Sequence, residues 1–187
     1  MKLTSSNFAA ALRLSPYQSC QQLWRVLTGR EARPPATAAM QWGSDNEPLA
    51  VAAVEAITGI LLDHTLDQQR TFGNGLYATK PDGIAGREGL EVKCPGTLYE
   101  SVPDHYLPQL QGQMWLADLD AVWFGAWTPE ETRLWRVTRS QDYIEQMVPL
   151  LDAFRWHLES DTEPGRARKP QFPTPDMERL QSRITKI

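Results

Sequence analysis

The most informative part of the sequence is KPDGIAGREGLEVKCP, residues 80–95. Residues 90–94 alternate apolar and polar side chains, which is typical of a half-buried strand, and the proline that follows ends that strand. Alternate residues of a strand share one face of a sheet. We therefore expect Glu91 and Lys93 on one face, with Val92 between them pointing into the core.

The turn sequence Pro-Asp-Gly at 81–83 can bring the carboxylate of Asp82 to the same polar face. Two converging carboxylates form a hard-oxygen site that suits Mg²⁺ or Mn²⁺ and is poor for zinc, and the backbone carbonyl of Val92 can complete the protein ligands. Lys93 is then a local cation that can position or help deprotonate a metal-bound water. This equipment suits hydrolysis of a phosphodiester. Two structural alternatives stay open, because an isolated Pro-Asp-Gly is usually a plain turn and Glu-x-Lys on a strand is usually a surface ion pair.

Other polar residues lie on predicted helices before and after this stretch. Glu47 is near the start of a helix, where the helix dipole favours an acid whether or not it has a function. Tyr106, Gln109 and Gln113 fall at i, i+3 and i+7 and form one polar stripe on an otherwise apolar helix. The stripe is either a solvated face or a surface whose amides contact a sugar-phosphate backbone or a metal-bound water.

The rest of the chain predicts an α/β domain, with helices flanking a central mixed sheet. Helical spacing, caps and glycine stops predict helices over 15–28, 46–58, 105–118 and 141–158. Short extended runs predict strands over 76–79, 90–94, 121–127 and 133–137. We expect a single domain over 1–160, followed by an extended C-terminal tail over 161–187, where proline, glycine and charge dominate.

Composition excludes several classes of protein. A chain of 187 residues with 41% hydrophobic residues can bury a core without disulfides. Two cysteines and three scattered histidines argue against a disulfide scaffold and against a structural zinc site. With no bilayer-length apolar run and no secretory signal, we expect a soluble, cytoplasmic protein. The net charge of -4 argues against a broad DNA-coating surface, although basic residues gather toward both ends of the chain.

Blocks of this sequence resemble the lambda exonuclease, or YqaJ-like viral recombinase, branch of the PD-(D/E)XK nuclease superfamily, and suggest a prophage-encoded bacterial member. In order, the blocks are LTSS at 3–6 with SPY at 15–17, LW at 23–24 and TG at 28–29; Gly43 with EP at 47–48; KPDGI at 80–84 with LEVKCP at 90–95; and Tyr106 with PQ at 108–109 and QGQMW at 111–115. Together they span residues 3 to about 127 and are more specific in this order than any one alone.

The resemblance implies a Mg²⁺-dependent 5′–3′ exonuclease, with Mn²⁺ as a substitute metal. Such an enzyme enters linear double-stranded DNA at an end, degrades the 5′-terminated strand to mononucleotides and leaves a 3′ overhang. The resemblance also implies a ring-shaped homotrimer that works beside a single-strand annealing protein in phage-type recombination.

The resemblance also assigns roles to residues. Those at the catalytic and metal-binding positions are Asp82, Glu91, Lys93, Glu47 and Gln109, with the carbonyl of Val92 as a further metal ligand. Ser6 matches a serine in the pocket for the terminal 5′-phosphate, and Tyr106 would pack beside the metal-binding residues. Beyond what the resemblance assigns, we also expect Lys80, Gln113, Arg13 and Arg25 to contact the substrate.

The phosphate pocket departs from the family pattern. The family's pocket arginine lies upstream of the block that contains Ser6, and here Met1 leaves no room for it. We expect Arg13 or Arg25 to substitute for that arginine. Lys80 stands where the family often has serine, and as a point charge it can take over part of the same role without bidentate geometry.

Two other functions compete with a duplex exonuclease. One is a structure-specific or single-strand DNA endonuclease on the same fold, because a metal site fixes the chemistry but not the polarity of cleavage. The other is a non-catalytic recombination adaptor. The presence of Asp82, Glu91 and Lys93 together favours a nuclease over the adaptor.

Overall fold

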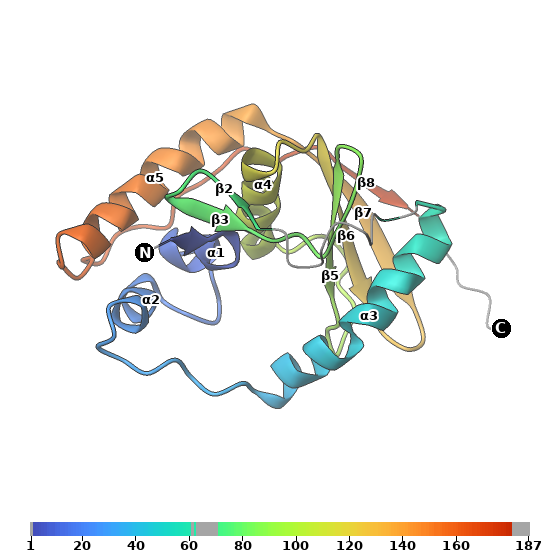
Figure 1. Cartoon of the computed structure of the whole chain (residues 1–187), viewed down its shortest axis with the longest axis horizontal. Coiled ribbons are helices and arrows are strands. Elements are labelled where there is room, and N and C mark those ends of the chain that lie inside the picture. Colours follow the sequence, from blue (N-terminus) through green and yellow to red (C-terminus); the bar gives the residue numbers. More distant parts are fainter. Residues whose placement is uncertain (1, 61, 63–70, 181–187) are drawn as a thin grey trace.

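The structure, a computed structural model, describes residues 2–60, 62 and 71–180, in which helices lie around two sheets (Figure 1). In chain order the elements are β1 (Leu3–Thr4), the 3-10 helix η1 (Ser5–Asn7), α1 (Phe8–Ala11), α2 (Cys20–Leu27), α3 (Ala38–Thr58), β2 (Phe72–Gly73), β3 (Tyr77–Thr79), β4 (Gly83–Ala85), β5 (Glu88–Lys93), the 3-10 helix η2 (Asp104–Tyr106), α4 (Leu107–Leu116), β6 (Ala121–Trp127), β7 (Thr132–Thr138), α5 (Gln141–Glu159) and β8 (Met177–Leu180).

The main sheet has the strand order β4-β5-β6-β7-β8. Strands β5 and β6 are parallel, with α4 in the crossover between them, and the other neighbouring pairs are antiparallel. A smaller sheet, β1-β3-β2, forms beside it. A mixed sheet flanked by helices confirms the predicted α/β class.

Helices α3 and α4 cover opposite faces of the main sheet (Figure 1). Val54 of α3 packs with Leu90 and Val92 of β5 on one face. On the other face, Met114 of α4 belongs to a larger cluster that includes Phe124 of β6. Because successive strand residues alternate faces, burying Val92 against α3 turns its neighbours toward α4.

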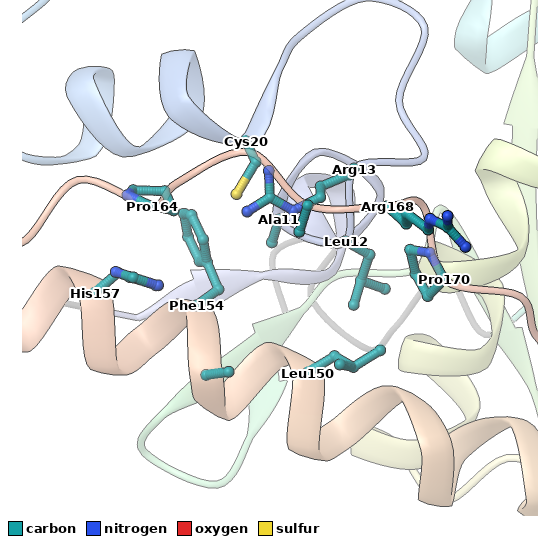
Figure 2. A pocket seen from close by; sticks show the side chains of 12 residues that line it. Ala11, Leu12, Arg13, Cys20, Leu150, Phe154, His157, Pro164, Arg168 and Pro170 are labelled. Carbon is teal, nitrogen blue, oxygen red and sulfur yellow. The ribbon is translucent and has the colours of Figure 1, made fainter.

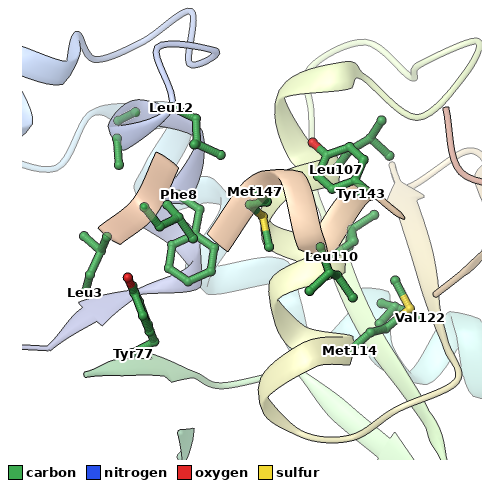
Figure 3. Packing of buried hydrophobic residues seen from close by; sticks show 14 of the residues in the cluster. Leu3, Phe8, Leu12, Tyr77, Leu107, Leu110, Met114, Val122, Tyr143 and Met147 are labelled. Carbon is green, nitrogen blue, oxygen red and sulfur yellow. The ribbon is translucent and has the colours of Figure 1, made fainter. Parts of the chain in front are cut away.

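The larger core lies where α4 and α5 pack against each other (Figure 3). Leu110, Met114 and Met147 are fully buried there. We predict that Leu110→Ala lowers the free energy of unfolding by about 2–5 kcal/mol, because it removes apolar contacts and leaves a cavity. Urea denaturation measures the loss. Leu49→Ala, at a side chain that is 57% exposed, is the control and is expected to cost less than about 0.5 kcal/mol. Equal losses in the two variants would contradict the assignment of Leu110 to the core.

The helix predicted from residue 15 begins later. Ser19 is the N-cap of α2, because its hydroxyl accepts a hydrogen bond of 3.1 Å from the backbone N–H of Gln22. Ser15 instead accepts hydrogen bonds from the N–H groups of Tyr17 and Gln18 and closes a turn. The helix start predicted at residue 15 was therefore wrong, because Ser15 caps a turn that precedes the helix.

The helix predicted over 46–58 is longer at its N-terminus. Thr37 caps α3 through a hydrogen bond of 3.2 Å from the N–H of Met40, so the helix begins at residue 38. Its end was predicted correctly, since Gly59 follows it in the left-handed conformation with φ 68°.

The segment after α5 runs extended along the domain and then joins the main sheet as β8 (Figure 1). The ring of Phe172 stacks on Tyr143 of α5 with 4.5 Å between centroids, and the N–H of Thr138 donates to the carbonyl of Asp176. The part of the expected tail between 161 and 180 thus packs on its own domain, while residues 181–187 lie outside the described residues.

In the described part of the chain, no helix combines the length and the apolar character that crossing a bilayer requires.

Candidate active site

Strand β5 carries an acid and a base on the face that meets α4. Glu91 is buried, at 2% exposure, and the Lys93 side chain is 26% exposed. The ammonium group of Lys93 forms an ion pair with Oε1 of Glu91. Val92 faces the opposite side and packs in the α3 cluster. The predicted alternation of the strand is therefore confirmed.

Asp82 lies directly before the β4–β5 hairpin and reaches β5 by backbone pairing. Its N–H donates to the carbonyl of Leu90 at 2.9 Å, and its Oδ2 accepts a hydrogen bond of 2.7 Å from the N–H of Val92. The hairpin between β4 and β5 turns further along, where Gly86 has φ 59°. The Pro-Asp-Gly sequence was thus wrong as the turn itself, although Asp82 does lie against the strand.

Helix α4 supplies the groups that hold Glu91. Nε2 of Gln109 donates to Oε1 of Glu91 at 2.7 Å, and Nε2 of Gln113 donates to Oε2 at 2.5 Å. The two glutamines are one helical turn apart and therefore share a face of α4. Gln113 is fully buried. The polar stripe predicted on this helix faces the carboxylates, so its interpretation as a solvated face was wrong.

Tyr106 covers the lysine. Its ring centroid lies 5.4 Å from Nζ of Lys93, a distance at which a cation is attracted to an aromatic ring. The ring also packs against Phe124, and its hydroxyl lies 3.2 Å from the hydroxyl of Tyr99. Burial raises the pKa of Tyr106, so the phenol stays neutral at physiological pH.

The site contains two carboxyl groups, those of Asp82 and Glu91, and one cationic side chain, that of Lys93. Burial and the charge of Glu91 raise the pKa of Asp82 well above its ordinary value, while Lys93 partly offsets them. Burial by itself lowers the pKa of Lys93, but the neighbouring Glu91 and Asp82 outweigh it and raise the pKa. The lysine is therefore protonated, and a further cation is what would neutralise the remaining carboxylate charge.

The donor set fits a hard divalent cation. Carboxylate oxygens of Asp82 and Glu91 are the ligands that Mg²⁺ prefers, and Mg²⁺ usually takes only one or two carboxylates from the protein and completes its shell with water and phosphate oxygens. A buried amide oxygen of Gln113, Oε1, also lacks a hydrogen-bond partner among the described residues. In the same part of the chain, no three His, Cys, Asp or Glu side chains form a group that could hold a metal by themselves.

Among the described residues, Glu47 makes no hydrogen bond or ion pair with Asp82, Glu91 or Lys93. It is exposed on α3, yet its charge contributes to the raised pKa of both Asp82 and Lys93. The structure thus places Glu47 within electrostatic range of the site, on the helix that packs against the other face of β5.

Residues expected at the phosphate pocket divide into two groups. Lys80 directly follows β3, and Ser6 lies in η1, which directly follows β1. Strands β1 and β3 are parallel neighbours, and both residues are exposed. Lys80 is two residues before Asp82, and the hydroxyl of Ser6 lies 3.0 Å from that of Thr4. The pairing of β1 with β3 therefore places the segments that carry Ser6 and Lys80 side by side.

Arg13 and Arg25 form the second group and bind the segment after α5. Arg13 donates to the carbonyl of Gly165 at 2.7 Å, and Arg25 forms an ion pair of 2.6 Å with Glu163. Neither has a contact with the carboxylates of the site among the described residues.

The sequence did not point to Tyr99 and His105, which surround Tyr106. The ring of His105 lies 4.2 Å from that of Tyr106, and its buried Nε2 has no hydrogen-bond partner in the described part of the chain. Tyr99 comes from the irregular segment before η2, where no periodicity exists to guide a prediction. For His105, the sequence offered one indication that it lies near the site, namely its position directly before Tyr106.

Comparison with known proteins places this geometry in context. The family model described as YqaJ-like viral recombinase domain matches residues 1–120. No curated protein matches the chain. Among solved structures, an alkaline exonuclease from Laribacter hongkongensis superposes with a TM-score of 0.70 at 23% identity, over 86% of this chain and 89% of that chain. The crystal structure of that exonuclease in complex with dAMP gives 0.71 at 22%, over the same shares. A phage-related exonuclease from Haemophilus somnus 129PT gives 0.67 at 13%, over 86% and 94%. At these identities the solved structures show a shared fold.

Proposed function

Because the chain belongs to the YqaJ-like viral recombinase family, we propose that it is a metal-dependent 5′–3′ exonuclease acting on the ends of double-stranded DNA. The observation that carries the proposal is the buried Glu91, held by Lys93, Gln109 and Gln113 with Asp82 beside it. Two proteins described as exonucleases share this fold, and one of them has been solved in complex with dAMP.

Each residue of the site has a part in this proposal. Asp82 and Glu91, with the carbonyl of Val92, would hold Mg²⁺ or Mn²⁺. When bound, the metal supplies charge that polarises the phosphate and lowers the pKa of water. Lys93 is placed to orient the attacking water and to hold positive charge near the reacting phosphate. Gln109 and Gln113 would fix the rotamer of Glu91 through their amide hydrogen bonds.

The terminal phosphate of the substrate is proposed to bind at the ends of β1 and β3. Ser6 would donate a hydroxyl and Lys80 would supply the charge, in a position that leads directly to Asp82. Tyr106 and Glu47 would contact the substrate or its water from η2 and α3. A single-strand annealing protein would then take the 3′ overhang.

We predict that Lys80→Ala lowers the preference for 5′-phosphorylated over 5′-hydroxyl ends by about tenfold, the effect of losing one hydrogen bond to a charged group. The measurement is the ratio of initial rates on the two substrates. Lys169→Ala, which removes the same charge from the C-terminal segment, is the control. Equal rates on both ends in the wild-type protein and in Lys80→Ala would rule the assignment out.

The assembly is proposed to be a homotrimeric ring around the DNA. An acidic protein is compatible with this, because only the channel needs positive potential and an acidic exterior keeps DNA off the outside. Light scattering coupled to gel filtration tests it, with an expected mass three times that of the single chain.

The function is tested on linear 5′-phosphorylated duplex DNA with each strand labelled separately, in Mg²⁺ or EDTA, beside a closed circle. Loss of the 5′-terminated strands alone, requiring metal and a free end, is the expected result. Cutting of the circle would favour the endonuclease instead. DNA binding without cleavage under any metal would favour the adaptor.

A further inference from the structure

A half-open cavity of about 230 Å³ lies between α1, α2, α5 and the segment that follows α5 (Figure 2). Apolar side chains make most of its wall, among them Leu12, Phe154 and Pro170. Figure 2 shows the guanidinium groups of Arg13 and Arg168 at the same cavity. The carboxylates of the candidate active site and the glutamines of α4 take no part in its lining.

The volume of the cavity limits which kind of group can fill it. Small-molecule sites usually measure about 300–1,000 Å³, whereas an apolar cavity of about 150 Å³ already accepts benzene. A volume of about 230 Å³ therefore suits one large aliphatic or aromatic side chain. Two apolar side chains of α5 are also exposed here: Leu150, which lines the cavity, is 42% exposed, and Trp156, next to the lining residue His157, is 57% exposed.

The charged side chains around the cavity favour a negatively charged partner. The nearby acids are already neutralised, because Asp161 pairs with Arg30 at 2.7 Å and Glu163 pairs with Arg25 at 2.6 Å. Arg13 binds only a backbone carbonyl, and Arg168 has no carboxylate partner among the described residues. In a chain of net charge -4, this face thus keeps unpaired cations beside an apolar cavity.

We propose that this cavity docks an acidic segment of a protein partner, which inserts one large apolar side chain and places its carboxylates on Arg13 and Arg168. A nucleic acid fits the wall less well, because single-stranded DNA binds on aromatic stacking platforms and this wall is mainly leucine, alanine and proline. The proposal goes beyond the exonuclease activity and does not depend on it.

The test uses a fluorescein-labelled pentapeptide with a central phenylalanine flanked by glutamates, and a second peptide with glycine at the centre. Fluorescence anisotropy with the full chain is expected to show tighter binding of the phenylalanine peptide. Arg168→Gln should weaken that binding about tenfold or more. Ala153→Gln should weaken it as well, because Ala153 is an exposed lining residue whose longer replacement blocks the cavity.

Arg166→Gln is the matched control. Arg166 is exposed two residues away and does not line the cavity, so its loss should change the affinity by less than about threefold. Equal losses for Arg166→Gln and Arg168→Gln, equal binding of both peptides, or no binding of either would overturn the proposal. Binding of a single-stranded oligonucleotide with the same dependence on Arg168 and Ala153 would assign the cavity to nucleic acid and overturn it too.

Discussion

Replacing Lys93 by alanine is expected to lower the rate of phosphodiester cleavage by about 10²–10⁴-fold, the range that a positioned proton-transfer or charge-stabilising group contributes. Lys93 lies against Glu91, and Tyr106 covers it, so its ammonium group is held at the carboxylates. Single-turnover rates on linear 5′-phosphorylated duplex DNA measure the loss, and DNA binding is expected to persist.

Stability must be separated from chemistry in that experiment. Removing one partner of a largely buried ion pair is destabilising, because Glu91 would keep a buried charge with fewer partners. Lys93→Arg keeps the positive charge and the pairing with Glu91, but a guanidinium is larger, planar and permanently protonated. Lys93→Arg is therefore expected to unfold near the wild-type temperature and still to lose at least about 10²-fold in rate. Wild-type activity in Lys93→Arg would show that the positive charge of Lys93 is all that the reaction requires of this residue.

The elements that the sequence predicted best are those with a long periodic pattern. The alternation around Glu91 predicted β5 and its two faces, and the stripe of Tyr106, Gln109 and Gln113 marked the face of α4 that meets it. Periodicity says which residues share a face, however, and not what that face meets. Only the packing of α4 across β5 shows that the glutamines bind Glu91.

Elements without a pattern were missed for identifiable reasons. Strands β1 and β2 have two residues each, too few for an alternation to be recognised, and their sheet depends on pairing across distant segments. The first turns of α3 are largely exposed, and Gly43 and Pro48 interrupt the helical signal there.

Long-range contacts also decide which partners Arg13 and Arg25 bind. Arg13 and Arg25 were expected at the phosphate pocket because of their charge. In the structure, both bind the extended segment after α5, Arg13 through the carbonyl of Gly165 and Arg25 through Glu163. An extended segment without periodicity gives no indication of where it packs. Lys80 is different, because its place two residues before Asp82 fixes its neighbourhood in the sequence itself.

Asp82→Asn is expected to abolish metal-dependent cleavage, with a loss of at least about 10³-fold, since under the proposed function it removes a charged metal ligand from a site with few others. The change keeps the shape of the side chain, and an amide oxygen can still accept the hydrogen bond from the N–H of Val92. The fold should therefore survive the substitution.

The same substitution should stabilise the metal-free protein. Burial and the charge of Glu91 raise the pKa of Asp82, so its ionised form is less favourable in the folded than in the unfolded chain. A raised pKa favours folding at pH values below the ordinary range of an aspartate and opposes it at neutral pH, where the carboxylate ionises. Asp82→Asn is accordingly expected to gain about 0.5–2 kcal/mol at pH 7, as when a strained functional site is relieved.

Thermal unfolding with and without Mg²⁺ connects the two effects. A ligand that binds only the folded state raises the unfolding temperature, so Mg²⁺ should stabilise the wild-type protein and have little effect on Asp82→Asn. Glu130→Gln removes one negative charge from an exposed turn and should respond to Mg²⁺ as the wild type does. An unchanged Mg²⁺ response in Asp82→Asn would remove Asp82 from the metal site even if cleavage were lost. Gain of stability together with loss of the Mg²⁺ response is the combination that only a destabilised ligand carboxylate produces, because a purely structural aspartate would lose stability when replaced.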